Sequence, residues 1–194
     1  MKKYIKRIID GVLIEELEAF GGVLIAGPKW CGKTTSASQL AKSSLFMHDE
    51  DSRESNIQMA KTKPSILLRG DSPRLIDEWQ IAPELWDAIR FDIDNRSTEG
   101  LFILTGSTIV DESKIMHSGA GRISRLLMRT MSLYESGDSN GTISLLELFN
   151  GKEDISAQTN LDIEDMAKIL VRGGWPNSIG KETKIAIRQI SGYC

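Results

Sequence analysis

A glycine-rich run near the N-terminus constrains the fold more than any other feature of this sequence. Residues 27–34 read Gly-Pro-Lys-Trp-Cys-Gly-Lys-Thr, a full match to the pattern G-x-x-x-x-G-K-[ST]. A wholly apolar run, residues 23–26, precedes it, and a helical stretch, residues 34–42, follows it. A buried strand, a glycine turn and a helix in that order are the context in which this pattern forms a phosphate-binding loop. The glycines let backbone amides turn toward phosphate oxygens, and the helix N-terminus adds positive potential.

The glycine-rich run therefore predicts a site for the phosphates of ATP. Lys33 would reach the β- and γ-phosphates with its ammonium group and is a predicted catalytic residue, while the Thr34 hydroxyl is a predicted ligand of Mg²⁺. An ordinary glycine turn ahead of a helix is the alternative interpretation. The predicted cofactor-binding residues are the run and the threonine after it: Gly27, Pro28, Lys29, Trp30, Cys31, Gly32, Lys33, Thr34 and Thr35.

A pair of acidic residues follows a second short apolar run. Leu75 and Ile76 lead directly into Asp77 and Glu78. Because ligands of open α/β sheets bind beyond the carboxyl ends of the strands, an acidic pair there would lie beside the loop. We predict that Asp77 holds Mg²⁺ through its water shell, and that Glu78 is catalytic and aligns the attacking water with the γ-phosphate. Without the loop, the same dipeptide would be an ordinary solvated pair.

Hydroxyl and guanidinium groups supply the remaining catalytic candidates. The apolar run 101–104 ends in Thr105-Gly106-Ser107, and a hydroxyl at the end of a strand between the two motifs could sense the γ-phosphate. Thr105 and Ser107 are both candidates. The alternative is that the tripeptide only ends the strand in a turn, because its residues are common in turns. Arg122 follows a glycine-containing segment and could neutralise charge on the transferred phosphoryl group as an arginine finger. A solvated surface arginine is the alternative.

The apolar patterning predicts an α/β domain with a central parallel sheet, because short apolar runs alternate with helical patterns. Strands are expected at 23–26, 44–48, 75–76, 101–104 and within 123–133, and helices at 14–20, 34–42, 57–60, 83–94 and 145–149. Residues 1–150 are expected to form the nucleotide-binding core. Residues 151–194 would form a short, incomplete helical tail with helices at 163–171 and 183–193.

Composition narrows the compartment and the partners. A typical domain has roughly 150 residues, so a chain of 194 residues leaves too few for a second large domain. The net charge of −3 argues against a nucleic-acid partner. The two cysteines, in a chain of a size that needs no disulfide framework, fit a reducing cytoplasm. No stretch approaches the roughly 20 apolar residues of a membrane span, so we expect a cytoplasmic protein without membrane contact.

Several conspicuous side chains carry weaker expectations. His48 and His117 are far apart in the sequence, and neither has cysteine or carboxylate residues nearby at the spacing of metal ligands. No metal site is therefore expected at either histidine. Trp79 and Trp86 are expected to pack against the sheet rather than to stack on a base. Cys31 lies beside a lysine at a helix N-terminus, an environment that activates thiols, so oxidation that blocks nucleotide binding is a hypothesis.

The chain resembles the N-terminal ATPase domain of bacterial and archaeal AAA+ type ATP-binding proteins whose longer members carry a C-terminal domain of unknown function. The Ile-Asp-Glu-Trp-Gln block, residues 76–80, is more specific than a phosphate-binding loop alone. The order and spacing of the matching segments agree along nearly the whole chain. These segments are residues 26–35, 73–80, 85–87, 102–107, 119–122 and 173–176.

The resemblance implies a three-layer P-loop NTPase fold with the P-loop strand at the centre of the sheet. Arginine fingers in such proteins normally act across a subunit interface, so a finger at Arg122 implies a homo-oligomer. Family members continue well past residues 173–176, which implies that a lid or C-terminal domain is truncated here. The implied roles are nucleotide and metal binding by Lys33 and Thr34, a Walker B pair of Asp77 and Glu78, and a sensor at Ser107 or Thr105.

These features together predict an ATPase that hydrolyses Mg-ATP to ADP and phosphate. Turnover would drive a conformational change in an unidentified protein client or in the attached domain. A nucleotide-binding switch or adaptor without turnover is one alternative. A small-molecule kinase is another, because such kinases share the same loop chemistry. Glu78 directly after Asp77 favours water over a kinase substrate as the acceptor.

Overall fold

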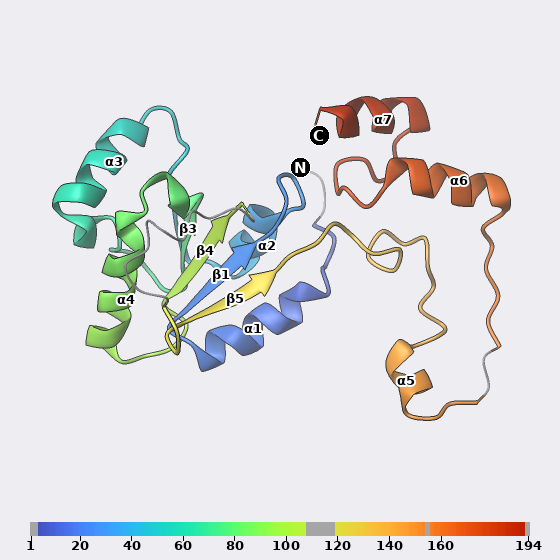
Figure 1. Cartoon of the computed structure of the whole chain (residues 1–194), viewed down its shortest axis with the longest axis horizontal. Helices are drawn as coiled ribbons and strands as arrows, with labels where there is room; N and C mark the ends of the chain where they lie inside the picture. Colours follow the sequence, from blue (N-terminus) through green and yellow to red (C-terminus); the bar gives the residue numbers. More distant parts are fainter. Residues whose placement is uncertain (1–3, 108–118, 154–155, 193–194) are drawn as a thin grey trace. The chain divides into compact units, whose positions relative to one another are not determined.

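The structure is a computed structural model, and it describes residues 4–107, 119–153 and 156–192. Residue His117 therefore lies outside the described residues. Strands and helices alternate in the first two thirds of the chain, and three helices follow (Figure 1). The elements are α1 (Ile9–Ala19), β1 (Gly22–Ala26), α2 (Lys33–Leu40), β2 (Ser43–Phe46), α3 (Arg53–Thr62), η1 (Pro64–Ile66), β3 (Arg74–Asp77), η2 (Trp79–Ile81), α4 (Glu84–Arg96), β4 (Phe102–Gly106), β5 (Ile123–Leu127), α5 (Leu145–Phe149), α6 (Ile163–Arg172) and α7 (Thr183–Ser191).

The five strands form one parallel sheet in the order β2-β3-β4-β1-β5. Their registers bring Ala26, Asp77 and Gly106 to the carboxyl edge, since Ala26 pairs with Gly106 and Asp77 pairs with Thr105. The fold is thus the predicted α/β P-loop NTPase type with a central parallel sheet. The P-loop strand is not the middle strand, however. Only β5 lies on its outer side, so β4 occupies the centre and separates β1 from β3.

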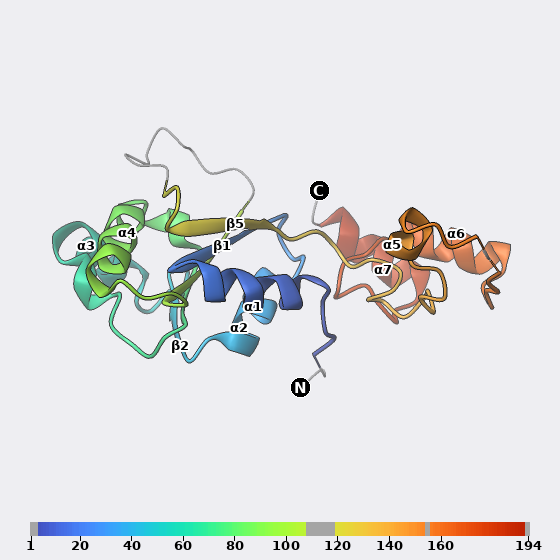
Figure 2. The ribbon, with the colours of Figure 1, turned by 90° about the horizontal axis from the view of Figure 1, so that it is seen from below.

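Helices cover both faces of the sheet. Alternate strand residues point to opposite faces, and Leu24 and Ile76 join one core cluster with Trp86 and Ile89 of α4. Val23 and its neighbours of the same parity are buried on the other face, along which α1 and α2 run (Figure 2). Right-handed crossovers explain the division, because the chain moves across the sheet in one direction from β1 to β2 and in the opposite direction from β2 to β4.

The predicted elements are all present, with shifted ends. Helix α4 begins directly after Pro83 and buries Leu85, Trp86, Ile89 and Ile93. Helix α1 begins at Ile9, five residues before the predicted start, because Leu13 and Leu17 both reach the core and Gly11 is tolerated in the first turn. Helix α3 is longer than the predicted 57–60 for a similar reason: its polar residues face solvent around the buried Ala60. No helix among the described residues combines the length and apolarity that crossing a membrane requires.

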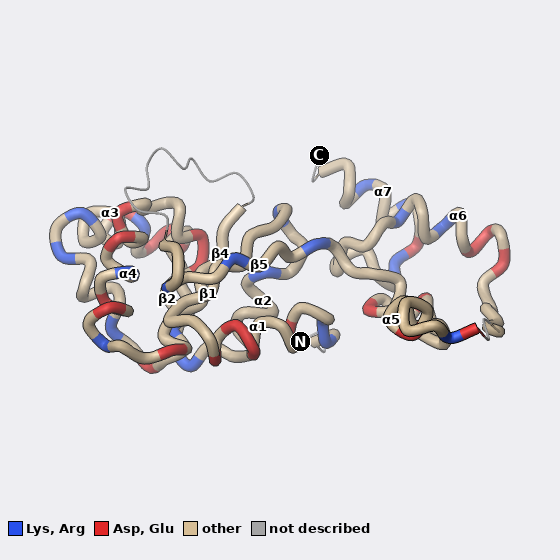
Figure 3. Tube along the Cα trace, turned by 60° about the horizontal axis from the view of Figure 1, so that its bottom comes forward, with Lys and Arg blue, Asp and Glu red and all other residues tan. Residues whose placement is uncertain are grey.

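The chain folds into two compact units. One, here called the core unit, comprises residues 8–129, and the other, the tail unit, comprises residues 1–7 and 130–194. The predicted division into domains at residue 150 stays a prediction. In the tail unit, α6 has acidic residues in its first turn and Arg172 in its last, the distribution that complements a helix dipole (Figure 3).

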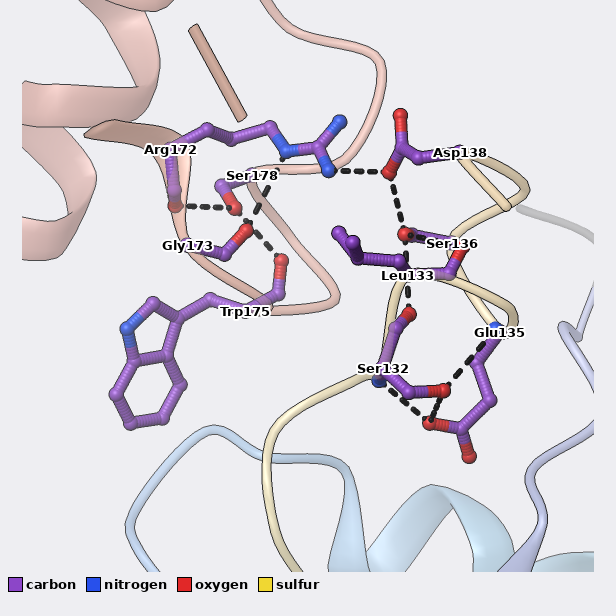
Figure 4. Close-up of polar contacts among 9 residues, drawn as sticks. All are labelled: Ser132, Leu133, Glu135, Ser136, Asp138, Arg172, Gly173, Trp175 and Ser178. Atoms are coloured by element: carbon purple, nitrogen blue, oxygen red, sulfur yellow. Dashed lines mark hydrogen bonds and ion pairs between the residues drawn. The ribbon is translucent and has the colours of Figure 1, made fainter. Parts of the chain in front are cut away.

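Two ion pairs connect segments of the tail unit, one of them buried and the other partly buried. Nε of Arg7 lies 2.9 Å from Oε1 of Glu135, with both side chains at most 7% exposed. Nη2 of Arg172 lies 2.6 Å from Oδ2 of Asp138, which also accepts a hydrogen bond from Ser136 (Figure 4). The amide of Met131 donates to the carbonyl of Gly174, 2.7 Å away. Charged pairs therefore connect the N-terminal residues and α6 to the segment that follows β5.

Candidate functional site

The candidate site is a cavity of about 500 Å³ beyond the carboxyl edge of the sheet. That volume lies in the range of small-molecule pockets. The glycine-rich run of residues 27–34, here called the P-loop, forms one side of the cavity, and the ends of β2 and β3 form the other. The lining residues are Lys29, Trp30, Gly32, Lys33, Thr34, Thr35, His48, Asp77, Glu78 and Ile81. Two predicted motifs that lie more than forty residues apart in the sequence are thus brought to one pocket.

The P-loop backbone adopts conformations that explain its composition. Gly32 has a φ of 104°, in the left-handed region that glycine enters without steric cost. Trp30 is also left-handed, with a φ of 66°, and its side chain is 65% exposed on the lining of the cavity. A non-glycine residue held in this region is strained, and such strain clusters at functional sites.

The first residue of the P-loop is packed against the end of β5. The amide of Met128 donates to the carbonyl of Ala26, 2.7 Å away. A Cβ atom on Gly27 would collide with the carbonyl oxygen of Met128, so only glycine fits there. Sγ of Cys31 lies 3.8 Å from the same oxygen. Cys31 is fully buried and faces the sheet, so burial protects its thiol and argues against the oxidation hypothesis.

Lys33 folds back onto the loop that precedes it. Its side chain donates from Nζ to the carbonyls of Gly27 and Pro28, each 3.0 Å away. The residue is only 5% exposed, and the ion pairs found among the described residues include no carboxylate partner for it. A buried ammonium group whose contacts are two neutral carbonyls is electrostatically under-compensated, which favours an anion beside it.

Asp77 is the centre of the polar contacts at this edge. Its Oδ1 accepts from the Thr34 hydroxyl at 2.6 Å and from the Thr105 hydroxyl at 2.5 Å. Its Oδ2 lies 3.3 Å from Nδ1 of His48. Asp77 is 2% exposed, so side chains from α2, from β4 and from the residues after β2 converge on one buried carboxylate at the end of β3. The hydroxyl and carboxylate oxygens of Thr34 and Asp77 are the ligand types that suit Mg²⁺.

Glu78 turns toward the cavity through an unusual backbone. Its φ of 55° and ψ of 46° are left-handed, and they end β3 before the short turn η2. Its amide donates to the Thr105 hydroxyl at 3.3 Å, and its Oε2 accepts a hydrogen bond from Nε2 of Gln80. The acidic pair is thus divided: Asp77 faces the P-loop hydroxyl, and Glu78 faces the open cavity.

Other predicted residues lie outside the lining of the cavity. Gly27, Pro28 and Cys31 belong to the loop but do not line it. Thr105 reaches the site only through Asp77, and Ser107 follows the end of β4. Arg122 precedes β5, whose first residue, Ile123, pairs with Gly22 at the start of β1. Strand β5 runs about 13 Å from Ile123 to its P-loop end, and Arg122 lies one residue further away, at the opposite edge of the sheet.

Two residues at the site were not predicted as functional. His48 was expected at a strand end, and it does follow β2, but its contact with Asp77 depends on the pairing of Phe46 with Asp77. No hydrophobic periodicity in the sequence points to Gln80, because its contact with Glu78 depends on the backbone turn at Glu78. Trp79 and Trp86 pack as predicted, with ring centroids 4.9 Å apart. The described residues contain no cluster of three or more His, Cys, Asp or Glu side chains that could hold a metal ion.

A strand, loop and helix that meet an acidic pair at one edge of a parallel sheet are the features of a P-loop NTPase domain. A family model described as an AAA domain matches residues 20–137, and the chain belongs to that family. Among solved structures, it is similar to the FIGL-1 AAA domain in complex with ADP, with 13% identity and a TM-score of 0.41. The match covers 69% of this chain and 60% of that one. No curated protein matches the sequence.

Proposed function

We propose that this chain binds ATP with Mg²⁺ and hydrolyses it to ADP and phosphate. The observation that carries the proposal is the pairing of Thr34 with Asp77 at 2.6 Å beside the carboxylate of Glu78 on the cavity lining. Lys33 and the loop amides would hold the phosphates, and membership of the AAA domain family supports nucleotide as the ligand. Bound Mg²⁺, held by Thr34 directly and by Asp77 through water, would neutralise phosphate charge.

The chemistry at the site is assigned to Glu78. Its free carboxylate oxygen would accept a proton from a water whose oxygen attacks the γ-phosphorus, as the bond to the β–γ bridging oxygen breaks. The electron pair of that bond leaves with ADP. Closure around the nucleotide would be transmitted to a protein client or to an attached domain, and we place this activity in the cytoplasm.

Two substitutions test the proposal. Lys33→Ala removes the buried ammonium group from the cavity lining and should abolish binding of a fluorescent ATP analogue. Glu78→Gln keeps the shape of the side chain but not its basicity, so it should bind ATP like the unchanged chain and lose phosphate release. Equal hydrolysis by Glu78→Gln and the unchanged chain would reject this mechanism.

A nucleotide-binding switch without turnover is the second candidate. The observation that favours it is the position of Arg122, which lies at the far edge of its own sheet, while the described residues that line the cavity include no arginine. Measurable ATP affinity without phosphate release at any protein concentration would support the switch.

A further inference from the structure

The carboxylate of Glu78 is not free on both oxygens, because Gln80 binds one of them. Nε2 of Gln80 donates to Oε2 of Glu78, from the adjoining turn η2. We propose that Gln80 is a positioning residue for ATP hydrolysis that acts by fixing the carboxylate of Glu78. This inference rests on the proposed function and concerns a residue outside the cavity lining.

The orientation of the Gln80 amide is determined by its surroundings. An ionised carboxylate only accepts hydrogen bonds, so the NH₂ group must face Glu78. The opposite end, Oε1, is buried and finds no hydrogen-bond partner among the described residues. A reversed amide would place its oxygen against the carboxylate of Glu78, a repulsive contact, so the observed orientation is the stable one.

Gly106 at the end of β4 provides the place for Oε1. A Cβ atom at Gly106 would lie 2.7 Å from Oε1 of Gln80 and 3.1 Å from Nε1 of Trp79. Oε1 of Gln80 and Nε1 of Trp79, neither of which has a hydrogen-bond partner among the described residues, therefore both lie where a side chain at position 106 would begin. Trp79 is fully buried and packs on Trp86, so the residue that precedes Gln80 in η2 is held in the core.

A fixed amide has a direct consequence for the carboxylate. With Oε2 engaged by Gln80, Oε1 of Glu78 is the oxygen left to accept a proton, and its direction is set by the contact with Gln80, which follows the fully buried Trp79 in η2. Rotation of an unheld glutamate would spread Oε1 over many positions, and a displacement of about 1 Å can lower a rate by about a hundredfold.

Gln80→Leu tests the inference by removing the amide while keeping the bulk. The kcat for ATP hydrolysis should fall about ten- to hundredfold, and the Kd for a fluorescent ATP analogue should stay within about twofold. The matched control is Gln58→Leu on the exposed side of α3, which should leave both values unchanged. A second variant, Gly106→Ala, would displace Oε1 of Gln80 and should lower kcat in the same way.

Combination with Glu78→Gln separates positioning from structural damage. Because Gln80 acts through Glu78, Gln80→Leu should not lower the residual turnover of Glu78→Gln any further. A wild-type kcat in Gln80→Leu would overturn the inference. An equal fold-loss in the Glu78→Gln background would overturn it as well. No turnover in the unchanged chain would instead overturn the proposed function and, with it, this inference.

Discussion

The Thr34 hydroxyl donates a 2.6 Å hydrogen bond to Oδ1 of Asp77, across 43 residues of sequence. Thr105 donates to the same oxygen at 2.5 Å from the neighbouring strand. The two threonines are chemically identical, but only Thr34 lines the cavity. The two residues are therefore a matched pair for experiment. The Thr34 hydroxyl can exchange the Asp77 carboxylate for a metal ion, whereas the Thr105 hydroxyl cannot.

Thr34→Val should therefore remove the dependence of ATP binding on Mg²⁺, while Thr105→Val should keep it. Valine preserves the shape of threonine in both places, and each change removes one donor to Asp77. Titration of ATP by calorimetry, with Mg²⁺ and with EDTA, measures the difference. A Thr105→Val variant that loses the Mg²⁺ effect as fully as Thr34→Val would contradict the metal assignment.

The second prediction concerns Arg122, whose Nε lies 2.5 Å from Oδ1 of Asp94 at the edge of the sheet opposite the P-loop. If Arg122 serves the site of a neighbouring copy, ATPase activity per chain should rise with protein concentration. Arg122→Ala should make that rate low and independent of concentration. Arg96→Ala, at a similarly exposed arginine paired with Asp92, is the control and should behave like the unchanged chain. A flat rate that Arg122→Ala leaves unaltered would reject a shared site.

The third prediction concerns pH and the tail unit. Burial by itself would raise the pKa of Asp138, but hydrogen bonds from Arg172 and Ser136 and the charge of Arg172 outweigh it and lower the pKa below its ordinary value of 3.8. A carboxyl whose pKa is lower in the folded state stabilises that state fully above its unfolded pKa and loses the contribution as pH falls through the folded pKa. The tail unit should therefore lose stability in acid.

Asp138→Asn tests the assignment because asparagine does not titrate. The free energy of unfolding of the tail unit should be lower than in the unchanged chain by about 1–3 kcal/mol near neutral pH. The difference should shrink below pH 3.8. Urea titrations followed through the NMR resonance of the Trp175 indole N–H report on this unit. A difference that stays constant down to the acid limit would refute the pKa assignment.

Local patterns were sufficient to predict the elements and the position of the P-loop in the fold. Apolar runs bounded by glycine or acidic residues marked β1, β3 and β4, because strands buried on both faces have few polar positions. The meeting of Thr34 and Asp77 followed from two motifs that share one sheet edge. The order of the strands could not be predicted in the same way. Which strand lies in the middle depends on which neighbour β5 pairs with, and no local sequence pattern specifies that pairing.

The contacts that escaped prediction depend on backbone turns or on distant pairs. The contact of Gln80 with Glu78 requires the left-handed turn at Glu78, a conformation that the sequence of a glutamate does not suggest. Arg7 and Glu135 are 128 residues apart, and neither belongs to a recognisable motif. Such long-range charge pairing follows from the completed fold and not from periodicity.

The packing of Gly27 under the carbonyl of Met128 has a mechanical consequence. Met128 is bound to the last residue of β1 through its amide and blocks the first residue of the P-loop through its oxygen. The chain leaves the core unit immediately afterwards, at residue 129. The last residues of the core unit therefore hold the start of the P-loop at two consecutive backbone positions, Ala26 and Gly27.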